Sequence, residues 1–425
     1  MNRLNVLWIL AFVFVSSKSI STNRLHADHW PQFRGPSGNG AVGNQALPTE
    51  WSESKNVRWF AKLKGLGWSS PVVLNGRIYL TTSIAENDDP KLLMGSQHLR
   101  LVCLDSRDGS EIFSREVMAQ DENSPKVHNK NSHASPTPVI EGDRIYLHFG
   151  HQGTAATDLE GNVLWTNREN PYPPTHGNGS SPIIVGNLLI LTCDGGDEPS
   201  TLALEKKTGK QVWKTPRNVE VGRKFSFCTP SLFTIDGKDQ LISAGSNIVQ
   251  SLDPVDGSVI WSVTYDGYSV IPKPIMNQGL VFICTGFGPT TLLAIDPSGR
   301  GDVTETHVRW RYKNQSVPKT PSLIAYRDQV IMSSDQGVGV AVDCKSGEEI
   351  WKKRLGGNYS ASPLLNGDLI YFQSEQGEAI VMQLGDEPQE IAKCSLPGRI
   401  FASFAIIDND LLIRTEDGLY RIGNE

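Results

Sequence analysis

The chain lacks the cysteine patterns that metal and redox motifs need. Its six cysteines are scattered over 425 residues, with no adjacent pair and no CxxC spacing. This excludes the common zinc and thioredoxin-like motifs. Disulfides are permitted in an exported chain, but the spacing assigns no pairs. We interpret Cys193 and Cys284, which fall within apolar strands, as small buried hydrophobes.

Basic residues are not in excess either. The chain has 40 Lys and Arg against 46 Asp and Glu, which gives a net charge of -6. A protein that binds nucleic acid needs a basic surface to neutralise phosphates. The composition therefore argues against a nucleic-acid partner.

Long apolar runs are missing beyond the first residues. Residues 6–15 are apolar and follow Arg3, and a polar stretch then ends at Ala27. This pattern predicts a secretory signal peptide over residues 1–27. The alternative is an uncleaved anchor, for which the apolar run is short. No cysteine lies near the cleavage region, so a lipoprotein is not expected. We expect an exported, periplasmic or extracellular protein whose mature chain has no transmembrane segment.

What the sequence does contain is a repeated unit. Residues 203–213 read as a short strand, a polar turn at Thr208-Gly209 and a second strand that ends near Trp213. An acidic residue and a glycine suit a tight hairpin, and the Trp four residues later can bury its ring between neighbouring sheets. The unit recurs with small changes at Asp105-Gly109-Phe113, Asp158-Gly161-Trp165, Asp253-Gly257-Trp261, Asp296-Trp310 and Asp343-Gly347-Trp351.

A second marker is a small or polar residue followed by proline and an apolar strand. Proline lacks an N–H, which is tolerated at the start of a strand. Successive prolines of the marker are 42 to 65 residues apart, and Ser403-Phe404 takes the last place without proline. The other markers are Ser70-Pro71, Ser135-Pro136, Ser181-Pro182, Thr229-Pro230, Lys273-Pro274, Thr320-Pro321 and Ser362-Pro363.

Four short strands in each unit are typical of β-propeller blades. The sequence contains seven full units and a partial one at residues 401–422, while an isolated strand around Trp59 precedes the first unit. We therefore predict an all-β, eight-bladed propeller of four-stranded antiparallel blades over residues 57–425. The N-terminal strand closes the ring, and residues 28–56 form an extended arm. A seven-bladed ring is the alternative. The repeated tryptophans are predicted to be structural and buried between blades: Trp59, Trp165, Trp213, Trp261, Trp310 and Trp351.

These residues resemble the pyrroloquinoline-quinone (PQQ) type propeller repeat. Its pattern of a small residue, Asp, Thr-Gly and Trp is the tryptophan-docking motif of quinoprotein dehydrogenases, and residues 203–213 match it with Glu205 in place of Asp. The resemblance is greatest to the non-enzymatic, BamB-like branch, which includes the propeller subunit of the outer-membrane β-barrel assembly machine. The opening Trp30-Pro31-Gln32-Phe33-Arg34-Gly35 is similar to secreted PQQ-like repeat proteins of Planctomycetes. The motif is specific for fold and weak for function.

The resemblance leaves two functions open. A quinoprotein dehydrogenase needs PQQ, a Ca²⁺ ion held by oxygen ligands and an Asp base. The chain has no adjacent cysteine pair and no recognisable calcium motif. We therefore expect a binding or scaffold module without a cofactor or catalysis, whose partner is an envelope protein or a polar ligand. The alternative is a PQQ-dependent alcohol or sugar dehydrogenase.

Candidate site residues lie in the loops before the innermost strands, which meet near the axis of a propeller. They supply polar and basic side chains that suit an anionic or polar ligand. The other reading is that they are solvated loop residues and turn caps. The candidates are Asn131, His133, His176, Asn178, Arg223, Lys224, Lys273, Lys319 and Tyr359. A weak metal candidate is the carboxylate loop with Asp194, Asp197 and Glu198.

Overall fold

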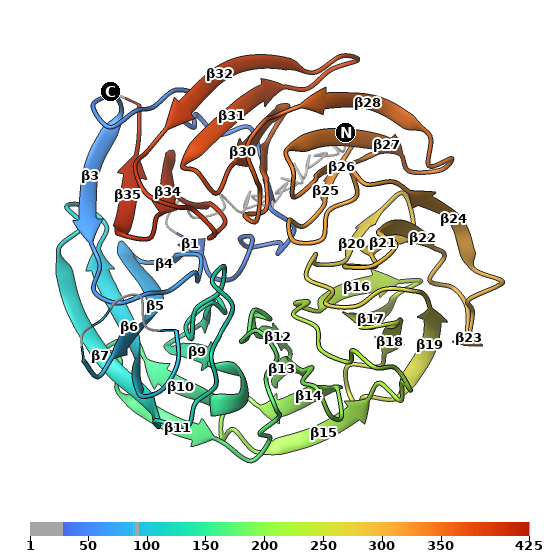
Figure 1. Cartoon of the computed structure of the whole chain (residues 1–425), viewed down its shortest axis with the longest axis horizontal. Coiled ribbons are helices and arrows are strands. Elements are labelled where there is room, and N and C mark those ends of the chain that lie inside the picture. Colours follow the sequence, from blue (N-terminus) through green and yellow to red (C-terminus); the bar gives the residue numbers. More distant parts are fainter. Residues whose placement is uncertain (1–28, 88, 90–92, 425) are drawn as a thin grey trace, which may run out of the picture.

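The structure is a computed structural model that describes residues 29–87, 89 and 93–424. Its strands form eight sheets arranged as blades around a central axis (Figure 1). The prediction of an all-β, eight-bladed propeller is therefore confirmed. The predicted signal peptide lies outside the described residues.

Each blade has four antiparallel strands, and the strand at the axis comes first in the first seven blades. Blade 1 has β4 (Val72–Leu74), β5 (Arg77–Ala85), β6 (Gln97–Asp105) and β7 (Glu111–Gln120). Blade 2 has β8 (Val139–Glu141), β9 (Arg144–His148), β10 (Thr154–Asp158) and β11 (Val163–Asn167), with a 3-10 turn at Gly150–Gln152. Blade 3 has β12 (Ile183–Val185), β13 (Leu188–Cys193), β14 (Ser200–Glu205) and β15 (Gln211–Pro216). Blade 4 has β16 (Ser231–Ile235), β17 (Lys238–Gly245), β18 (Ile248–Leu252) and β19 (Val259–Thr264).

The remaining blades follow the same order along the chain. Blade 5 has β20 (Ile275–Asn277), β21 (Leu280–Cys284), β22 (Thr291–Ile295) and β24 (Val308–Lys313). Blade 6 has β25 (Ile324–Tyr326), β26 (Gln329–Ser333), β27 (Val338–Asp343) and β28 (Glu349–Arg354). Blade 7 has β29 (Leu364–Asn366), β30 (Leu369–Gln373), β31 (Glu378–Gln383) and β32 (Gln389–Ser395). Blade 8 has β33 (Ala405–Ile407), β34 (Asp410–Arg414) and β35 (Gly418–Ile422) from the C-terminal end.

The ring closes as the sequence predicted. The outer strand of blade 8 is β3 (Val57–Lys62), which pairs antiparallel with β35 from Val57 opposite Ile422 to Lys62 opposite Gly418. Figure 1 shows these two strands side by side at the edge of the ring. Closure pairs the sheet edges that an open array would leave exposed.

Blade 3 shows the backbone geometry of the regular repeated unit. Ala203 lies opposite Trp213, and a β-bulge follows between Ala203 and Leu204. The small side chain of Ala203 leaves room for the indole. The turn glycine, Gly209, donates its N–H to the carbonyl of Glu205 and has a φ of 74°. An L side chain rarely adopts this conformation, which explains glycine at this place.

Each tryptophan of the regular units contacts the following blade. The Trp165 indole N–H donates to the carbonyl of Lys206 at 3.1 Å, and a Cβ on Gly209 would lie 2.5 Å from the Trp165 ring. Trp261 differs because the next turn is stretched, and its N–H donates instead to Gln240 Oε1 in its own blade. Trp213, Trp261 and Trp351 are buried, as predicted. The prediction of burial is wrong for Trp59, Trp165 and Trp310, which are partly exposed at the outer edge of the ring.

The N-terminal arm is more ordered than an extended arm need be. Its short strands β1 (His29–Trp30) and β2 (Ala41–Val42) pair with the inner strands of blades 1 and 7. Between them the carbonyl of Pro31 accepts the N–H of Ile140 in blade 2. The arm thus runs across the inner edges of the ring, near the centre of Figure 1. A third added strand, β23 (Gly301–Asp302), pairs with the outer strand of blade 4.

Within the part of the chain that the structure describes, no helix is long and apolar enough to cross a membrane.

Candidate functional site

A cavity of about 440 Å³ lies where the inner strands of the blades begin. We call it the axial pocket. Phe33 of the N-terminal arm is among its lining residues, together with side chains from all eight blades or the loops that lead into them. Its lining combines aromatic rings with serine and threonine hydroxyls.

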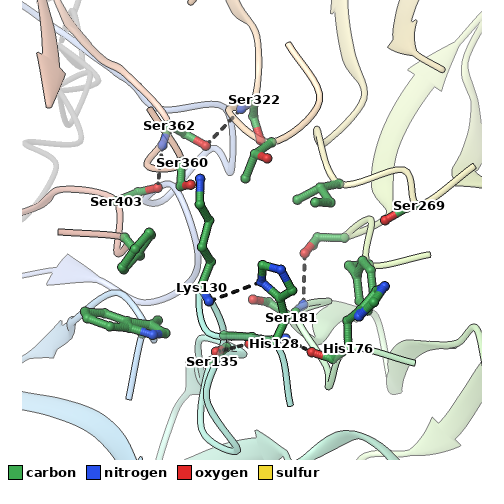
Figure 2. Close-up of a pocket in the computed structure, with 18 of the residues that line it drawn as sticks. His128, Lys130, Ser135, His176, Ser181, Ser269, Ser322, Ser360, Ser362 and Ser403 are labelled. Carbon is green, nitrogen blue, oxygen red and sulfur yellow. Dashed lines mark hydrogen bonds between the residues drawn. The ribbon is translucent and has the colours of Figure 1, made fainter. Parts of the chain in front are cut away.

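The hydroxyls accept hydrogen bonds between six of the eight pairs of neighbouring blades, from blade 1 to blade 4 and from blade 5 to blade 8. At equivalent places, a backbone N–H of one blade donates to a hydroxyl oxygen of the next blade at 2.9 to 3.1 Å. The donors are the N–H groups of Ser70, Thr137, Ser181, Lys273, Ser322 and Ser362. The acceptors, which we call the hydroxyl ring, are the side chains of Thr137, Ser181, Thr229, Ser322, Ser362 and Ser403. Figure 2 shows the bonds that link Ser322, Ser362 and Ser403.

The ring corrects two of the sequence markers. In blades 2 and 6 the equivalent residues are Thr137 and Ser322, whereas the markers were placed at Ser135-Pro136 and Thr320-Pro321. Each marker was placed two residues before the residue that forms the hydrogen bond. Residues two apart lie on the same face of a strand, so the alternation of apolar and polar residues does not distinguish them.

Lys273 takes the ring position in blade 5, where no hydroxyl is present. Its side chain is buried, and its Nζ donates to the carbonyl of Gly38 in the N-terminal arm at 2.9 Å. Burial, with a smaller contribution from the nearby Arg34 cation, lowers the pKa of Lys273 to about 7. Arg34 is also buried, and its Nη2 donates to the carbonyl of Leu323, next to Ser322.

Aromatic rings form an arc along one side of the pocket mouth. The ring of His176 meets that of Phe225 at 5.3 Å between centroids, Phe225 meets Tyr268 at 6.1 Å, and Tyr268 meets Phe287 at 6.1 Å. His128 meets His176 edge-on at 5.5 Å, which extends the arc toward blade 2. These edge-on and tilted contacts join the rings into one surface.

Cations lie over the same rings. The guanidinium of Arg223 is 4.4 Å from the Tyr268 ring centre, and the Lys319 ammonium is 5.2 Å from that of Phe287. Such cation–π contacts hold positive charge at the mouth. We call this surface, from His128 to Phe287 with its two cations, the aromatic arc.

The loop before blade 2 crosses the pocket. Lys130 reaches across it toward Ser360 (Figure 2), and its Nζ pairs with Glu375 of blade 7 at 2.8 Å. Asn131 donates to the carbonyl of His176, which ties this loop to the next one. His176 has a φ of 65°, an uncommon conformation for a residue other than glycine that is often found at functional sites.

The structure brings only some of the predicted residues to the mouth. Asn131 and His176 line the pocket, and Arg223 and Lys319 belong to the aromatic arc. Lys224 is partly buried and does not line the pocket.

The expected position at the mouth is corrected for His133, Asn178, Lys273 and Tyr359. All four are buried and none lines the pocket. Two of them have partners within the protein that account for their position. Asn178 accepts a hydrogen bond from the buried Tyr172 hydroxyl, and Lys273 donates to the carbonyl of Gly38.

The carboxylate loop does not assemble a metal site. Asp194 is fully buried and forms a two-pronged salt bridge with Arg217, at 2.7 and 2.8 Å, while Asp197 and Glu198 are exposed. Among the described residues, no group of three or more His, Cys, Asp or Glu side chains is placed to hold a metal. The weak candidate is corrected, because Arg217 already takes both oxygens of Asp194.

The sequence predicted His176, Arg223 and Lys319 of the aromatic arc but missed its other rings, those of His128, Phe225, Tyr268 and Phe287. Phe225 and Tyr268 precede inner strands, in the same loops that supplied the polar candidates. The usable signal was an aromatic residue four or five positions before the ring residue. Phe287 lies in a loop between β21 and β22 and carried no such signal.

Comparison with known proteins agrees with this geometry. The family model described as outer membrane protein assembly factor BamB matches residues 80–223 and 198–393. The chain belongs to the BamB family. A curated BamB from Burkholderia pseudomallei is 27% identical over 97 residues, and this match spans 23% of the chain and only 25% of that protein.

Solved structures show the same fold at low identity. BamB from Moraxella catarrhalis has a TM-score of 0.59 and 16% identity, and the match covers 86% of this chain and 96% of that one. The quinohemoprotein alcohol dehydrogenase from Comamonas testosteroni has a TM-score of 0.52 and 10% identity, with 94% and 81% covered. At these identities the likeness shows the propeller fold alone.

The axial pocket of this BamB-family chain does not fit a calcium-assisted quinone site. Calcium needs six or more oxygen ligands that are free to bind it. No Asp or Glu is among the described residues that line the pocket. Two carboxylates that bond to its lining are already engaged: Glu375 pairs with Lys130 and Ser360, and Asp335 accepts from Lys319 N–H and Thr320. The donor set therefore disagrees with the quinoprotein alternative.

Proposed function

We propose that this protein is an exported, non-catalytic binding module that holds a segment of an envelope protein at the mouth of the axial pocket. The polar-ligand reading is kept within this proposal, because the pocket offers hydroxyls and cations to the bound segment.

One observation carries the proposal: the aromatic arc. It places His176, Phe225, Tyr268 and Phe287 in contact with one another at the rim of an open cavity, with Arg223 and Lys319 over two of the rings. Aromatic and arginine side chains around a pocket are the usual anchors of protein interfaces.

The relatives support the class of partner. The family model and the relative from Burkholderia pseudomallei are both described as outer membrane protein assembly factor BamB. The apolar run at residues 6–15 supports export. A propeller that joins an assembly needs a rigid surface, which a ring of eight packed blades supplies. It does not need reacting groups.

Variants of the aromatic arc test the proposal. Tyr268→Ala combined with Phe287→Ala removes two rings from the mouth, and we expect at least tenfold weaker binding to the envelope protein that the unchanged chain captures from the producing cells. The matched control is Val255→Ala, since Val255 is 75% exposed and does not line the pocket. Unchanged binding by the double variant would contradict the proposal, most clearly if a change on an outer blade edge abolished capture instead.

The dehydrogenase alternative has its own test. Adding PQQ and Ca²⁺ should give neither a bound-quinone spectrum nor dye-linked oxidation of alcohols or sugars. Appearance of both would replace the binding module by an enzyme.

A further inference from the structure

We propose that the hydroxyl ring of the axial pocket binds an oxyanion, the phosphate or carboxylate group of the ligand. This inference rests on the proposed function in placing the ligand at the pocket, and it adds the chemistry of the group that anchors it.

The members of the hydroxyl ring accept hydrogen bonds within the protein but do not donate their own protons to any described residue. A serine or threonine hydroxyl has one proton to donate and two lone pairs that accept. Each member of the hydroxyl ring accepts a backbone N–H from the preceding blade, yet no described residue accepts its proton. All six members line the pocket. Their protons are therefore available to a ligand atom that accepts hydrogen bonds.

Some buried hydroxyls elsewhere in the propeller use their proton within the protein. Ser251 donates to Gln240 Oε1 at 2.7 Å, and Ser246 donates to the carbonyl of Phe225 at 2.7 Å. The hydroxyl ring differs from these two because all six of its members both keep their protons and face one cavity.

Two basic side chains beside the hydroxyl ring, Arg34 and Lys273, have no carboxylate partner among the described residues. Lys273 donates its backbone N–H to the hydroxyl of Ser322, and Arg34 donates to the carbonyl of the next residue, Leu323. The side chains of Arg34 and Lys273 donate only to backbone carbonyls, and among the described residues neither forms an ion pair with a carboxylate. Nε and Nη1 of Arg34 have no partner among the described residues.

Buried charges of one sign are costly unless an opposite charge offsets them. Because neither side chain pairs with a described carboxylate, an anion on the axis would favour the charged form of both, including Lys273, whose pKa burial lowers to about 7. Arg223 and Lys319 of the aromatic arc add positive charge at the mouth, so a negative group is drawn inward. At about 440 Å³ the pocket holds more than one small ion, so we expect the oxyanion to belong to a larger ligand.

Inorganic phosphate is the first probe. Titration of the whole protein, followed by calorimetry and by ³¹P line broadening at constant ionic strength against chloride, should show saturable binding at one site. Absence of saturable binding overturns the proposal. A rise in melting temperature alone does not support it, because phosphate also stabilises folded proteins by exclusion from their surface.

Ser181 offers a matched pair of variants. Ser181→Asp keeps an oxygen that accepts the Thr137 N–H but places a negative charge in the ring, so phosphate affinity should fall at least tenfold. Ser181→Asn is the neutral control and should stay within severalfold of the unchanged chain. Equal phosphate affinity of both variants would locate the ion elsewhere and overturn the proposal.

Lys273→Gln tests the buried charge even if the ring variants fail to fold. The amide can still donate to Gly38, so the arm should stay in place while phosphate binding weakens by about tenfold. Unchanged affinity would show that the cation does not act on the site.

A pair of dipeptides separates the two sources of the anion. Acetyl-Gly-Phe with a free carboxylate is compared with the same dipeptide as its carboxamide, each in competition with phosphate. Competition by the carboxylate form alone assigns a carboxylate, and failure of both assigns a phosphoryl group. Equal competition by both forms overturns the proposal. If phosphate binds as described but no envelope protein is captured, the proposed function fails alone; if the partner binds regardless of phosphate and of Ser181→Asp, the oxyanion site fails alone.

Discussion

The indole N–H of Trp59 donates to the backbone carbonyl of Ser106 at 2.9 Å, and this bond joins the last blade to the first. The two residues are 47 positions apart in the chain, but the closing strand β3 brings them together. The same contact places Gly109 against the Trp59 ring, where a Cβ would approach to 2.7 Å. This indole, and the glycine that makes room for it, therefore contribute to the contact between the last blade and the first.

Gly109→Ala should destabilise the closure. Gly142→Ala is the matched control, because Gly142 also has a positive φ but no atom lies within 4 Å of its added Cβ. The control should cost roughly 1–2 kcal/mol for the left-handed conformation alone. The Gly109 variant should cost about 1–3 kcal/mol more through overpacking against the indole. Urea unfolding measures both, and equal losses would contradict the role given to Trp59.

Trp213→Ala should lower the free energy of unfolding by roughly 3–5 kcal/mol, the usual range for a large buried side chain. Trp213 is 8% exposed and its N–H donates to the carbonyl of Pro254 in the next blade. Val255→Ala, a change at a neighbouring exposed residue, should stay within about 0.5 kcal/mol. If the Trp213 variant melted at the original temperature yet lost its partner, the side chain would be functional instead.

Asp194→Asn should be strongly destabilising, by roughly 3–5 kcal/mol, because it leaves the buried Arg217 cation without its carboxylate. Asp197→Asn, in the same loop but exposed, should be nearly neutral. Thermal unfolding of the two variants, with and without calcium, makes the comparison. A calcium-dependent melting temperature that Asp197→Asn removes would restore the metal reading of this loop.

Stability should fall in mild acid because of a buried histidine. Burial lowers the pKa of His133 to about 4, against about 6.5 when unfolded. Between these values the unfolded chain binds more protons, so stability is full above about pH 6.5 and is lost as pH falls toward 4. The loss from this residue is on the order of 3 kcal/mol. His133→Gln should flatten this part of the urea-midpoint profile, whereas His98→Gln, at a half-exposed site, should not; identical profiles for all three chains would refute the assignment.

The fold could be predicted because its signals repeat. A glycine with positive φ and a tryptophan opposite a small residue are local requirements of the repeated unit. The sequence therefore shows these residues at regular spacing. The register of the inner strands was harder, since Ser135-Pro136 and Thr137-Pro138 offer the same residue types two positions apart. The hydrogen bonds of Thr137 with Ser70 and Ser181 in the neighbouring blades distinguish them.

The sequence predicted where the candidate pocket lies, but not most of the residues that line it. Loops before inner strands do converge on the axis, and Asn131 and His176 lie there. Sequence reasoning favoured polar residues, but which side of a loop faces the axis depends on packing with the next blade. That packing turns Tyr359 inward and leaves Tyr268 at the mouth.

Site-specific photo-crosslinking in intact cells of the producing organism tests the central claim most directly. A benzoylphenylalanine in place of Phe287, in the aromatic arc, should crosslink to one envelope protein, whereas the same group in place of Val255 should not. Crosslinking at Val255 with none at Phe287 would contradict the claim that this protein binds its partner at the axial pocket.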